Sequence, residues 1–201
     1  MPFDVPLRCQ CARVRGVATE VSPSSGFRFV CYCKDCQAFA HFLGRDIQIL
    51  DAQGGSDIVQ VLPKNVSFTQ GIEALACIRL TDKGMLRWYA SCCNTPIGNT
   101  MANFKISFIG LVHNCLENSQ TPLQDSFGPV RVWANTQGAK GDPKPKSRGV
   151  GTIMLWAVAN VLKARINGSY KETPFFLKDK GTPIAAPRVL SGAELADVMA
   201  R

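Results

Sequence analysis

The stretch Val30-Cys31-Tyr32-Cys33-Lys34-Asp35-Cys36-Gln37 carries three cysteines in a C-x-C-x-x-C pattern, the most chemically specific motif of the chain. Two further groups flank it along the sequence, Cys9-Gln10-Cys11 before it and Cys92-Cys93 after it. Seven of the nine cysteines therefore fall into three groups. In a reducing compartment, clustered cysteines are more often thiolate ligands than disulfides, so the pattern predicts bound metal.

The composition predicts a folded chain that does not cross a membrane. With 201 residues, of which 46% are hydrophobic, the chain can bury a sizeable core as one domain or as one domain with an extension. Residues 1–9 lack a basic segment followed by an apolar one, so we expect no secretory signal and a cytoplasmic location. The longest apolar run, 150–162, is shorter than the roughly 20 residues that span a bilayer. We interpret it as a buried helix and expect no membrane partner.

The positive charge is concentrated in the C-terminal part of the sequence. The net charge is +8, and residues 121–201 hold 12 Lys/Arg against 6 Asp/Glu, so this part supplies +6 of it. The charge would suit an acidic partner, and it is also typical of an ordinary solvated surface. Aromatic residues do not alternate with Lys/Arg in the basic loop 138–151, so nucleic-acid binding is not favoured.

Short β-prone runs separated by glycine-containing breaks fill the first half of the sequence. The turn Asp82-Lys83-Gly84 separates the runs 74–80 and 85–89 and predicts a hairpin, whose second arm leads to Cys92-Cys93. The residues from Cys36 to Gly44 are compatible with a short helix closed by the glycine and also with a strand. Further strands are expected at 27–30, 66–68 and 106–112. These runs predict a mainly β domain over residues 1–120.

The C-terminal extension, residues 121–201, is expected to carry two helices that pack on the same domain. The first covers 151–166, with basic residues in its last turn and Asn167-Gly168 as a stop signal. The second begins at Ser191, which forms a capping-box pattern with Glu194.

The cysteine spacing is suited to zinc. On a strand, residues i and i+2 point to the same face, so Cys9 and Cys11, and likewise Cys31 and Cys33, are expected to present their sulfurs side by side. Four thiolates close a structural zinc site, whereas three leave a coordination position for water or substrate. Cys31, Cys33 and Cys36 therefore indicate an open site. The alternative is that these cysteines pack as small hydrophobic residues.

The order of these motifs resembles the glutathione-dependent formaldehyde-activating enzyme family, which includes the centromere protein V group. The resemblance covers residues 7–112 and rests on C-x-C, then C-x-C-x-x-C, then a cysteine group that follows Arg87-Trp88-Tyr89 and leads into Thr95-Pro96. It implies a zinc-stabilised, tent-like antiparallel β fold similar to Mss4. It also implies that Cys9, Cys11 and Cys93 are structural ligands and that Cys31, Cys33 and Cys36 hold the reactive zinc.

This chain departs from the family pattern at the third group. Ala90 stands where the family has the first cysteine of a C-x-x-C motif, and Cys92 could replace that ligand only if the backbone bends between Cys92 and Cys93. Asn94 replaces a frequent glycine and can tolerate a left-handed conformation. Ala12 also replaces a glycine, so we expect an ordinary backbone there.

The remaining candidate residues are two cysteines and two histidines. Cys77 and Cys115 are interpreted as core residues. His41 is either packed in the protein or near the open site, and no role is assigned to His113.

The resemblance implies a zinc-dependent carbon-sulfur lyase activity on a glutathione, or other thiol, adduct of an aldehyde such as formaldehyde, with one or two zinc ions. The cationic residues expected near the substrate are Lys34, Arg45 and Arg87, and Asp35 is a candidate for proton transfer. One alternative is a non-catalytic zinc-stabilised β module that binds a protein or nucleic acid. Another is a redox or metal-handling protein that uses Cys92 and Cys93.

Overall fold

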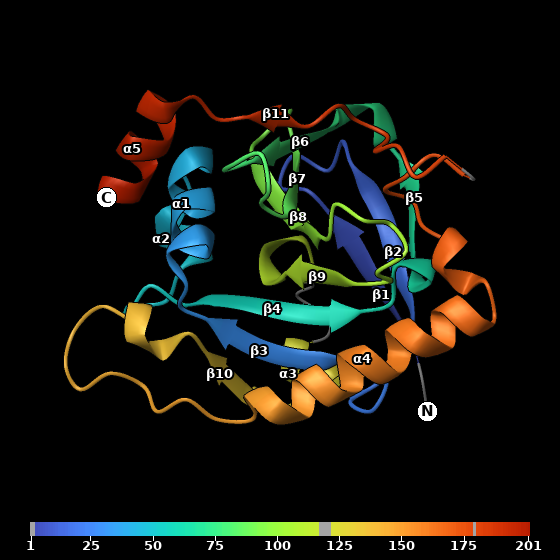
Figure 1. Cartoon of the computed structure of the whole chain (residues 1–201), viewed down its shortest axis with the longest axis horizontal. Helices are drawn as coiled ribbons and strands as arrows, with labels where there is room; N and C mark the ends of the chain where they lie inside the picture. The colour runs from blue at the N-terminus through green and yellow to red at the C-terminus, as the bar shows by residue number, and fades with distance from the viewer. Residues whose placement is uncertain (1–2, 117–121, 179) are drawn as a thin grey trace.

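Eleven strands form two sheets in the described part of the chain, which comprises residues 3–116, 122–178 and 180–201 of the computed structural model (Figure 1). The smaller sheet has the order β1-β2-β5, with antiparallel neighbours. Its strands are β1 (Phe3–Arg8), β2 (Arg15–Val21) and β5 (Val66–Gln70). The prediction of a mainly β chain is confirmed.

The larger sheet has the order β10-β3-β4-β9-β8-β7-β6-β11, and it bends so that β3 and β4 run across the direction of β6 and β7 (Figure 1). The two edge strands pair in parallel with their neighbours, and the inner strands pair antiparallel. Its strands are β3 (Phe27–Cys31), β4 (Ser56–Val61), β6 (Leu75–Arg79), β7 (Leu86–Ala90), β8 (Thr95–Thr100), β9 (Ile109–Val112), β10 (Val132–Ala134) and β11 (Arg188–Val189). The hairpin predicted around Asp82-Lys83-Gly84 is confirmed as the β6–β7 pair.

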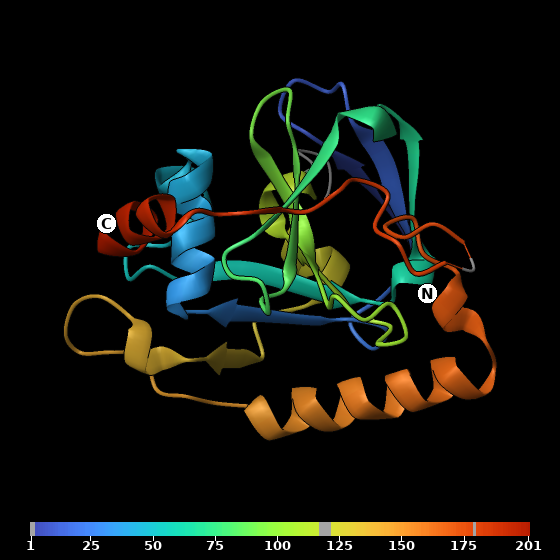
Figure 2. The ribbon, with the colours of Figure 1, turned by 45° about the horizontal axis from the view of Figure 1, so that its top comes forward.

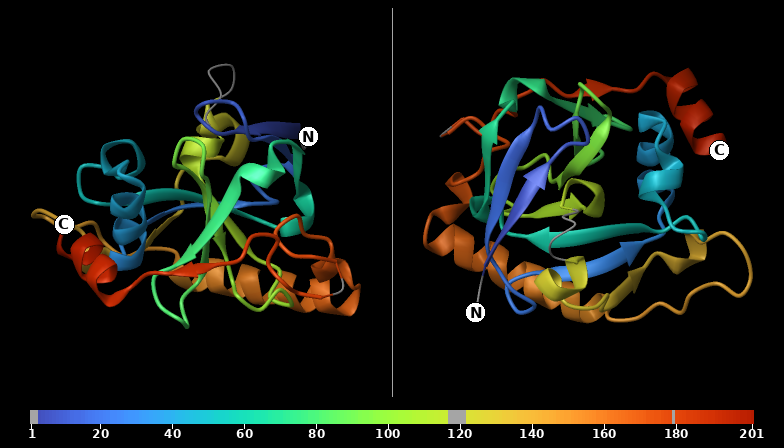
Figure 3. Two further views of the ribbon diagram at one scale, coloured as in Figure 1. Left: turned by 90° about the horizontal axis from the view of Figure 1, so that it is seen from above. Right: turned by 180° about the vertical axis from the view of Figure 1, so that it is seen from behind.

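The main core lies between the two sheets, which pack face to face (Figure 3). Trp88 on β7 is fully buried there, and its indole N–H donates to Thr100 Oγ1 at 3.0 Å. The ring of Phe175, from the C-terminal part of the chain, lies 5.2 Å from that of Trp88 and is also fully buried. The C-terminal part therefore completes the core, and it also supplies the edge strands β10 and β11. The domain boundary expected near residue 120 lies outside the described residues.

Five α-helices and five short 3-10 turns accompany the sheets in the described residues. Helix α1 ends at Gly44, whose φ of 63° places it in the left-handed region that glycine accepts without strain. The run from Cys36 to Gly44 is therefore helical rather than a strand. The α-helices are α1 (Lys34–Leu43), α2 (Asp46–Ile49), α3 (Leu123–Phe127), α4 (Val150–Ile166) and α5 (Gly192–Ala200), and the 3-10 turns are Pro63–Asn65, Ile72–Ala74, His113–Cys115, Thr136–Gly138 and Ser169–Lys171.

Both predicted C-terminal helices are confirmed. Helix α5 begins with the expected capping box, in which Ser191 Oγ accepts from the N–H of Glu194, and the Glu194 carboxylate accepts from the N–H of Ser191. It lies beside α1 (Figure 1). The interpretation of α4 as a buried helix was wrong, because one of its faces is exposed to solvent along its whole length. Within the described residues, no helix combines the length and apolar character needed to cross a membrane.

Candidate metal sites

Four cysteines meet where two turns approach each other. Cys9 and Cys11 lie in the turn between β1 and β2, and Cys92 and Cys93 lie in the turn between β7 and β8. The Sγ–Sγ distances are 3.5 Å for Cys9–Cys11, 3.3 Å for Cys11–Cys92, 3.8 Å for Cys9–Cys92 and 3.8 Å for Cys92–Cys93. Sulfurs that lie about 2.3 Å from one tetrahedral zinc are about 3.8 Å from one another. The four-cysteine cluster therefore has the ligand type and spacing of a closed zinc site.

The β1–β2 turn brings its two sulfurs together by a route other than the expected strand geometry. The N–H of Val14 donates to Cys9 Sγ at 3.3 Å, and the N–H of Ala12 donates to the Cys9 carbonyl at 2.9 Å. Ala12 adopts a φ of 60°, so the ordinary backbone expected there was also wrong. The turn curls around Cys9 so that the N–H of Val14 points at the sulfur, and the chain passes through a left-handed residue just after Cys11.

The backbone bends in the β7–β8 turn, and this bend allows both Cys92 and Cys93 to join the four-cysteine cluster. The turn begins after Ala90, the last residue of β7, and Asn94 adopts the left-handed conformation at φ 52°. The expectation that Asn94 can adopt this conformation is confirmed. The hydroxyl of Thr95 lies 3.1 Å from Cys93 Sγ and accepts the N–H of Gln10 at 3.0 Å, which ties the two turns together.

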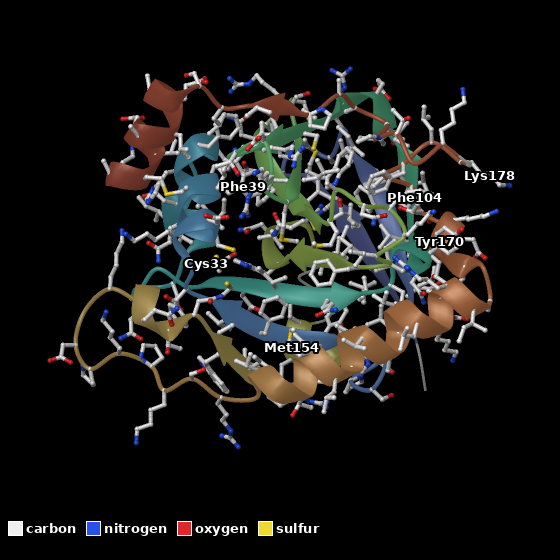
Figure 4. All side chains as sticks on the ribbon, viewed as in Figure 1. Cys33, Phe39, Phe104, Met154, Tyr170 and Lys178 are labelled. Atoms are coloured by element: carbon white, nitrogen blue, oxygen red, sulfur yellow. The ribbon has the colours of Figure 1, made fainter. Side chains whose placement is uncertain are left out.

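The second cluster consists of three cysteines at the junction of β3 and α1. Cys31 is the last residue of β3, Cys33 is the N-cap residue of α1, and Cys36 lies in the first helical turn (Figure 4 labels Cys33). Their sulfurs lie within 4.8 Å of one another. Among the described residues, the set has no fourth member. The sulfurs of Cys31 and Cys33 lie close together as expected, but not as two residues of one strand, because β3 ends at Cys31. The start of α1 brings Cys36 to the same point.

Two polar side chains from distant parts of the sequence lie next to the three-cysteine cluster. Arg87 on β7 is 3% exposed, and its guanidinium lies 3.4 Å from Asp35 Oδ2 and 3.2 Å from Asn99 Oδ1. The pKa of Cys36 is raised well above its usual value by the neighbouring sulfurs of Cys31 and Cys33 and by burial, and the positive charge of Arg87 acts in the opposite direction. Asn135, just after β10, donates from Nδ2 to Cys31 Sγ at 3.3 Å. Three thiolates and a divalent ion carry a net negative charge, so a buried arginine nearby is suited to holding such a group.

Comparisons with known proteins place the chain in a family. Residues 1–185 match the family of unknown function DUF6151. The chain belongs to this family. A crystal structure of a Rhodobacter sphaeroides protein, a target of Northeast Structural Genomics, is similar over 65% of this chain and 99% of its own length, with 16% sequence identity and a TM-score of 0.41. No curated protein matches the sequence.

In this DUF6151 chain, two pockets border the four-cysteine cluster, and both are lined by Arg45 and Gln48. One has a volume of about 260 Å³ and includes Cys9 and Arg8 in its lining; the other has a volume of about 520 Å³ and includes Cys92 and Cys93. Of the cationic residues expected near the substrate, Arg45 thus lies beside the four-cysteine cluster, Arg87 lies beside the three-cysteine cluster, and Lys34 is exposed in the first turn of α1.

The remaining candidates lie apart from both clusters. Cys77 and Cys115 are buried in the main core, as predicted, and burial raises the pKa of Cys77 to about 12. His41 is buried on α1 and belongs to neither set of ligand atoms among the described residues. Sequence reasoning missed Asn135, which lies 104 positions from Cys31 and reaches it only because β10 pairs with β3.

Proposed function

We propose that this chain binds two zinc ions and performs carbon-sulfur lyase chemistry at the three-cysteine cluster, on the adduct of an aldehyde such as formaldehyde with glutathione or another thiol. Its motif order, similar to that of the glutathione-dependent formaldehyde-activating family, supports the reaction class. The proposal includes a tent-like β fold of the Mss4 type and a small thiol as the partner.

The division into four plus three cysteines is the observation that carries this proposal. Four sulfurs at tetrahedral spacing leave no ligand position free, so the four-cysteine cluster is suited to a structural ion. Three sulfurs leave one position, which is the arrangement of catalytic zinc sites. A zinc ion held by Cys31, Cys33 and Cys36 would supply a Lewis acid that favours the thiolate form of a substrate sulfur.

Residues next to the three cysteines would orient the ligands and offset their negative charge. Asn135 fixes the orientation of Cys31 through its hydrogen bond to the sulfur. Arg87 offsets the negative charge of the thiolates from within the core, and its ion pair positions the carboxylate of Asp35. Because the side chain of Asp35 is 53% exposed, an incoming thiol can reach its carboxylate, which is the candidate proton acceptor in this proposal.

Metal content and turnover together test the proposal. Protein purified without chelator is expected to contain two zinc ions, and to accelerate the exchange of formaldehyde with glutathione, followed by NMR. Cys36→Ser should lower the zinc content to one and abolish the acceleration, whereas Cys77→Ala, a buried cysteine outside both clusters, should change neither. If Cys36→Ser retains two zinc ions and full activity, the proposal is wrong.

The burial of the three-cysteine cluster favours one alternative, a non-catalytic zinc-stabilised module that binds a protein partner. Cys31 and Cys36 are buried and only Cys33 is partly exposed, so substrate access to the fourth ligand position is narrow. This alternative predicts two zinc ions with no acceleration of formaldehyde exchange and no glutathione binding in a calorimetric titration.

A further inference from the structure

Helix α4 presents an apolar stripe to solvent along its full length. The exposed fractions are 60% for Met154, 75% for Leu155, 54% for Val158, 56% for Leu162 and 87% for Ile166. With 3.6 residues per turn, positions 155, 158, 162 and 166 lie on one face, and Met154 lies at its edge. The opposite face packs on the protein, where the ring of Trp156 lies 5.3 Å from that of Phe27 and Ala164 is buried.

The segment of sequence that carries this stripe is basic. Residues 143–171 contain six Lys/Arg and no Asp/Glu. Lys163 and Arg165 lie at the two sides of the stripe, and three basic residues precede the helix in the loop 143–149. Figure 2 shows this loop and α4 along the same edge of the molecule. Figure 4 shows the edge with Met154 labelled.

The combination of apolar and basic character narrows the possible partners. A second copy of the chain would bring two such acid-free segments together, and like charges would repel across the contact. Nucleic acid would satisfy the charges but would place phosphates against the apolar stripe. An anionic lipid bilayer satisfies both, because its acyl region takes up apolar side chains while its headgroups meet lysine and arginine.

We propose that α4 is an interfacial helix that binds this chain to anionic membranes, lying parallel to the bilayer surface with the face of Leu155, Leu162 and Ile166 inserted. A helix of 17 residues is about 25 Å long, which is shorter than the roughly 30 Å hydrocarbon core. It therefore lies on the membrane rather than across it, and the proposal replaces the expectation of no membrane partner, which rested on the length of the apolar run. This inference does not depend on either zinc site.

Vesicle co-sedimentation tests the inference on the whole, zinc-loaded chain. The protein is expected to sediment with phosphatidylcholine vesicles that contain phosphatidylserine and to remain in the supernatant with phosphatidylcholine alone. The double variant Leu155→Gln/Leu162→Gln should bind at least about tenfold more weakly, because it removes two inserted side chains. The double variant Lys163→Gln/Arg165→Gln should bind the vesicles more weakly, and its remaining binding should be less sensitive to salt concentration. Ile47→Gln is the matched control, since Ile47 is 88% exposed on α2, away from this edge.

Three results would overturn the inference. The first is the absence of binding to phosphatidylserine vesicles. The second is binding that the Leu155→Gln/Leu162→Gln variant retains in full, which would show adsorption of any basic protein. The third is a dimer in light scattering that this variant converts to a monomer, with no vesicle binding by either form, which would assign the stripe to a second copy.

Discussion

The Sγ of Cys92 lies 3.3 Å from the Sγ of Cys11, across 81 positions of sequence. This contact joins the β1–β2 and β7–β8 turns, so an ion held there would stabilise the packing of the smaller sheet on the larger one. Cys92→Ser and Cys93→Ser should each remove one of two zinc ions and lower the melting temperature, since structural zinc contributes directly to folding. Metal analysis and thermal unfolding measure both effects, with Cys115→Ala as a zinc-neutral control. A Cys92→Ser variant with two zinc ions would show that Cys92 is a neighbour and not a ligand.

The buried guanidinium of Arg87 is expected to set the affinity of the three-cysteine cluster. Arg87→Gln removes the charge that opposes the raised pKa of Cys36, so zinc affinity at this site should fall by about tenfold or more, as it does when residues that support metal ligands are replaced. Arg87→Lys should retain most of it. Chelator competition measures the affinity. Arg28→Gln, which breaks the ion pair with Asp57 on the neighbouring strands, is the control and should not change it.

The backbone of Gly138 packs closely on the segment that carries the three-cysteine cluster. A Cβ there would overlap the carbonyl oxygen of Tyr32, between two of the cysteines, and the Gly138 carbonyl accepts from Gln37 Nε2. Gly138→Ala should therefore destabilise the protein by about 2 kcal/mol through overpacking and lower zinc retention at this cluster. Gly151→Ala, where a Cβ meets nothing within 4 Å, should leave zinc content unchanged and slightly stabilise α4. Urea unfolding of both variants provides the comparison.

Ala12 is strained by its left-handed backbone. At φ 60° an alanine costs about 1–2 kcal/mol relative to its ordinary conformation, and glycine adopts this region freely. After allowing for the greater freedom of glycine in the unfolded chain, Ala12→Gly should stabilise the protein by about 0.5–1 kcal/mol. Ala159→Gly, on the exposed side of α4, should instead lower the free energy of unfolding by about 1 kcal/mol. Equal destabilisation by both changes would contradict the strain argument.

Local sequence signals predicted the elements that depend on neighbours in the chain. The hairpin at 82–84 and the capping box of Ser191 follow from turn and cap chemistry within a few residues, and both are present. The cysteine groups were recognised for the same reason, since spacing indicates ligand type. The strand geometry assigned to Cys9 and Cys11 failed because the chain curls into a turn there, in which the N–H of Val14 donates to Cys9 Sγ and the N–H of Ala12 donates to the Cys9 carbonyl.

Features that depend on tertiary contacts could not be predicted in this way. Strands β10 and β11 have three and two residues, too few for a periodic pattern, and they form only because β3 and β6 offer free edges. Asn135 reaches the three-cysteine cluster through that pairing. Helix α4 is apolar nearly all round, so its sequence gives no indication of which face is covered, and the exposed stripe emerges only from the packing of the opposite face.

His41 is expected to make the protein sensitive to acid. It is buried on α1, and burial, with the nearby charges of Lys140 and Arg201, lowers its pKa, while Asp46 acts in the opposite direction. The unfolded chain takes up the proton near pH 6.5, whereas the folded chain resists it, so stability falls as the pH drops below that value.

His41→Phe, which keeps an aromatic ring but cannot be protonated, should lose less stability than the wild type between neutral and mildly acidic pH. Urea unfolding of the two zinc-saturated proteins across this range measures the difference. Both carry the same cysteines, so any acid-induced release of metal is common to them and cancels in the comparison. Parallel pH profiles would show that His41 is protonated as readily in the folded chain as in the unfolded one, contrary to its burial.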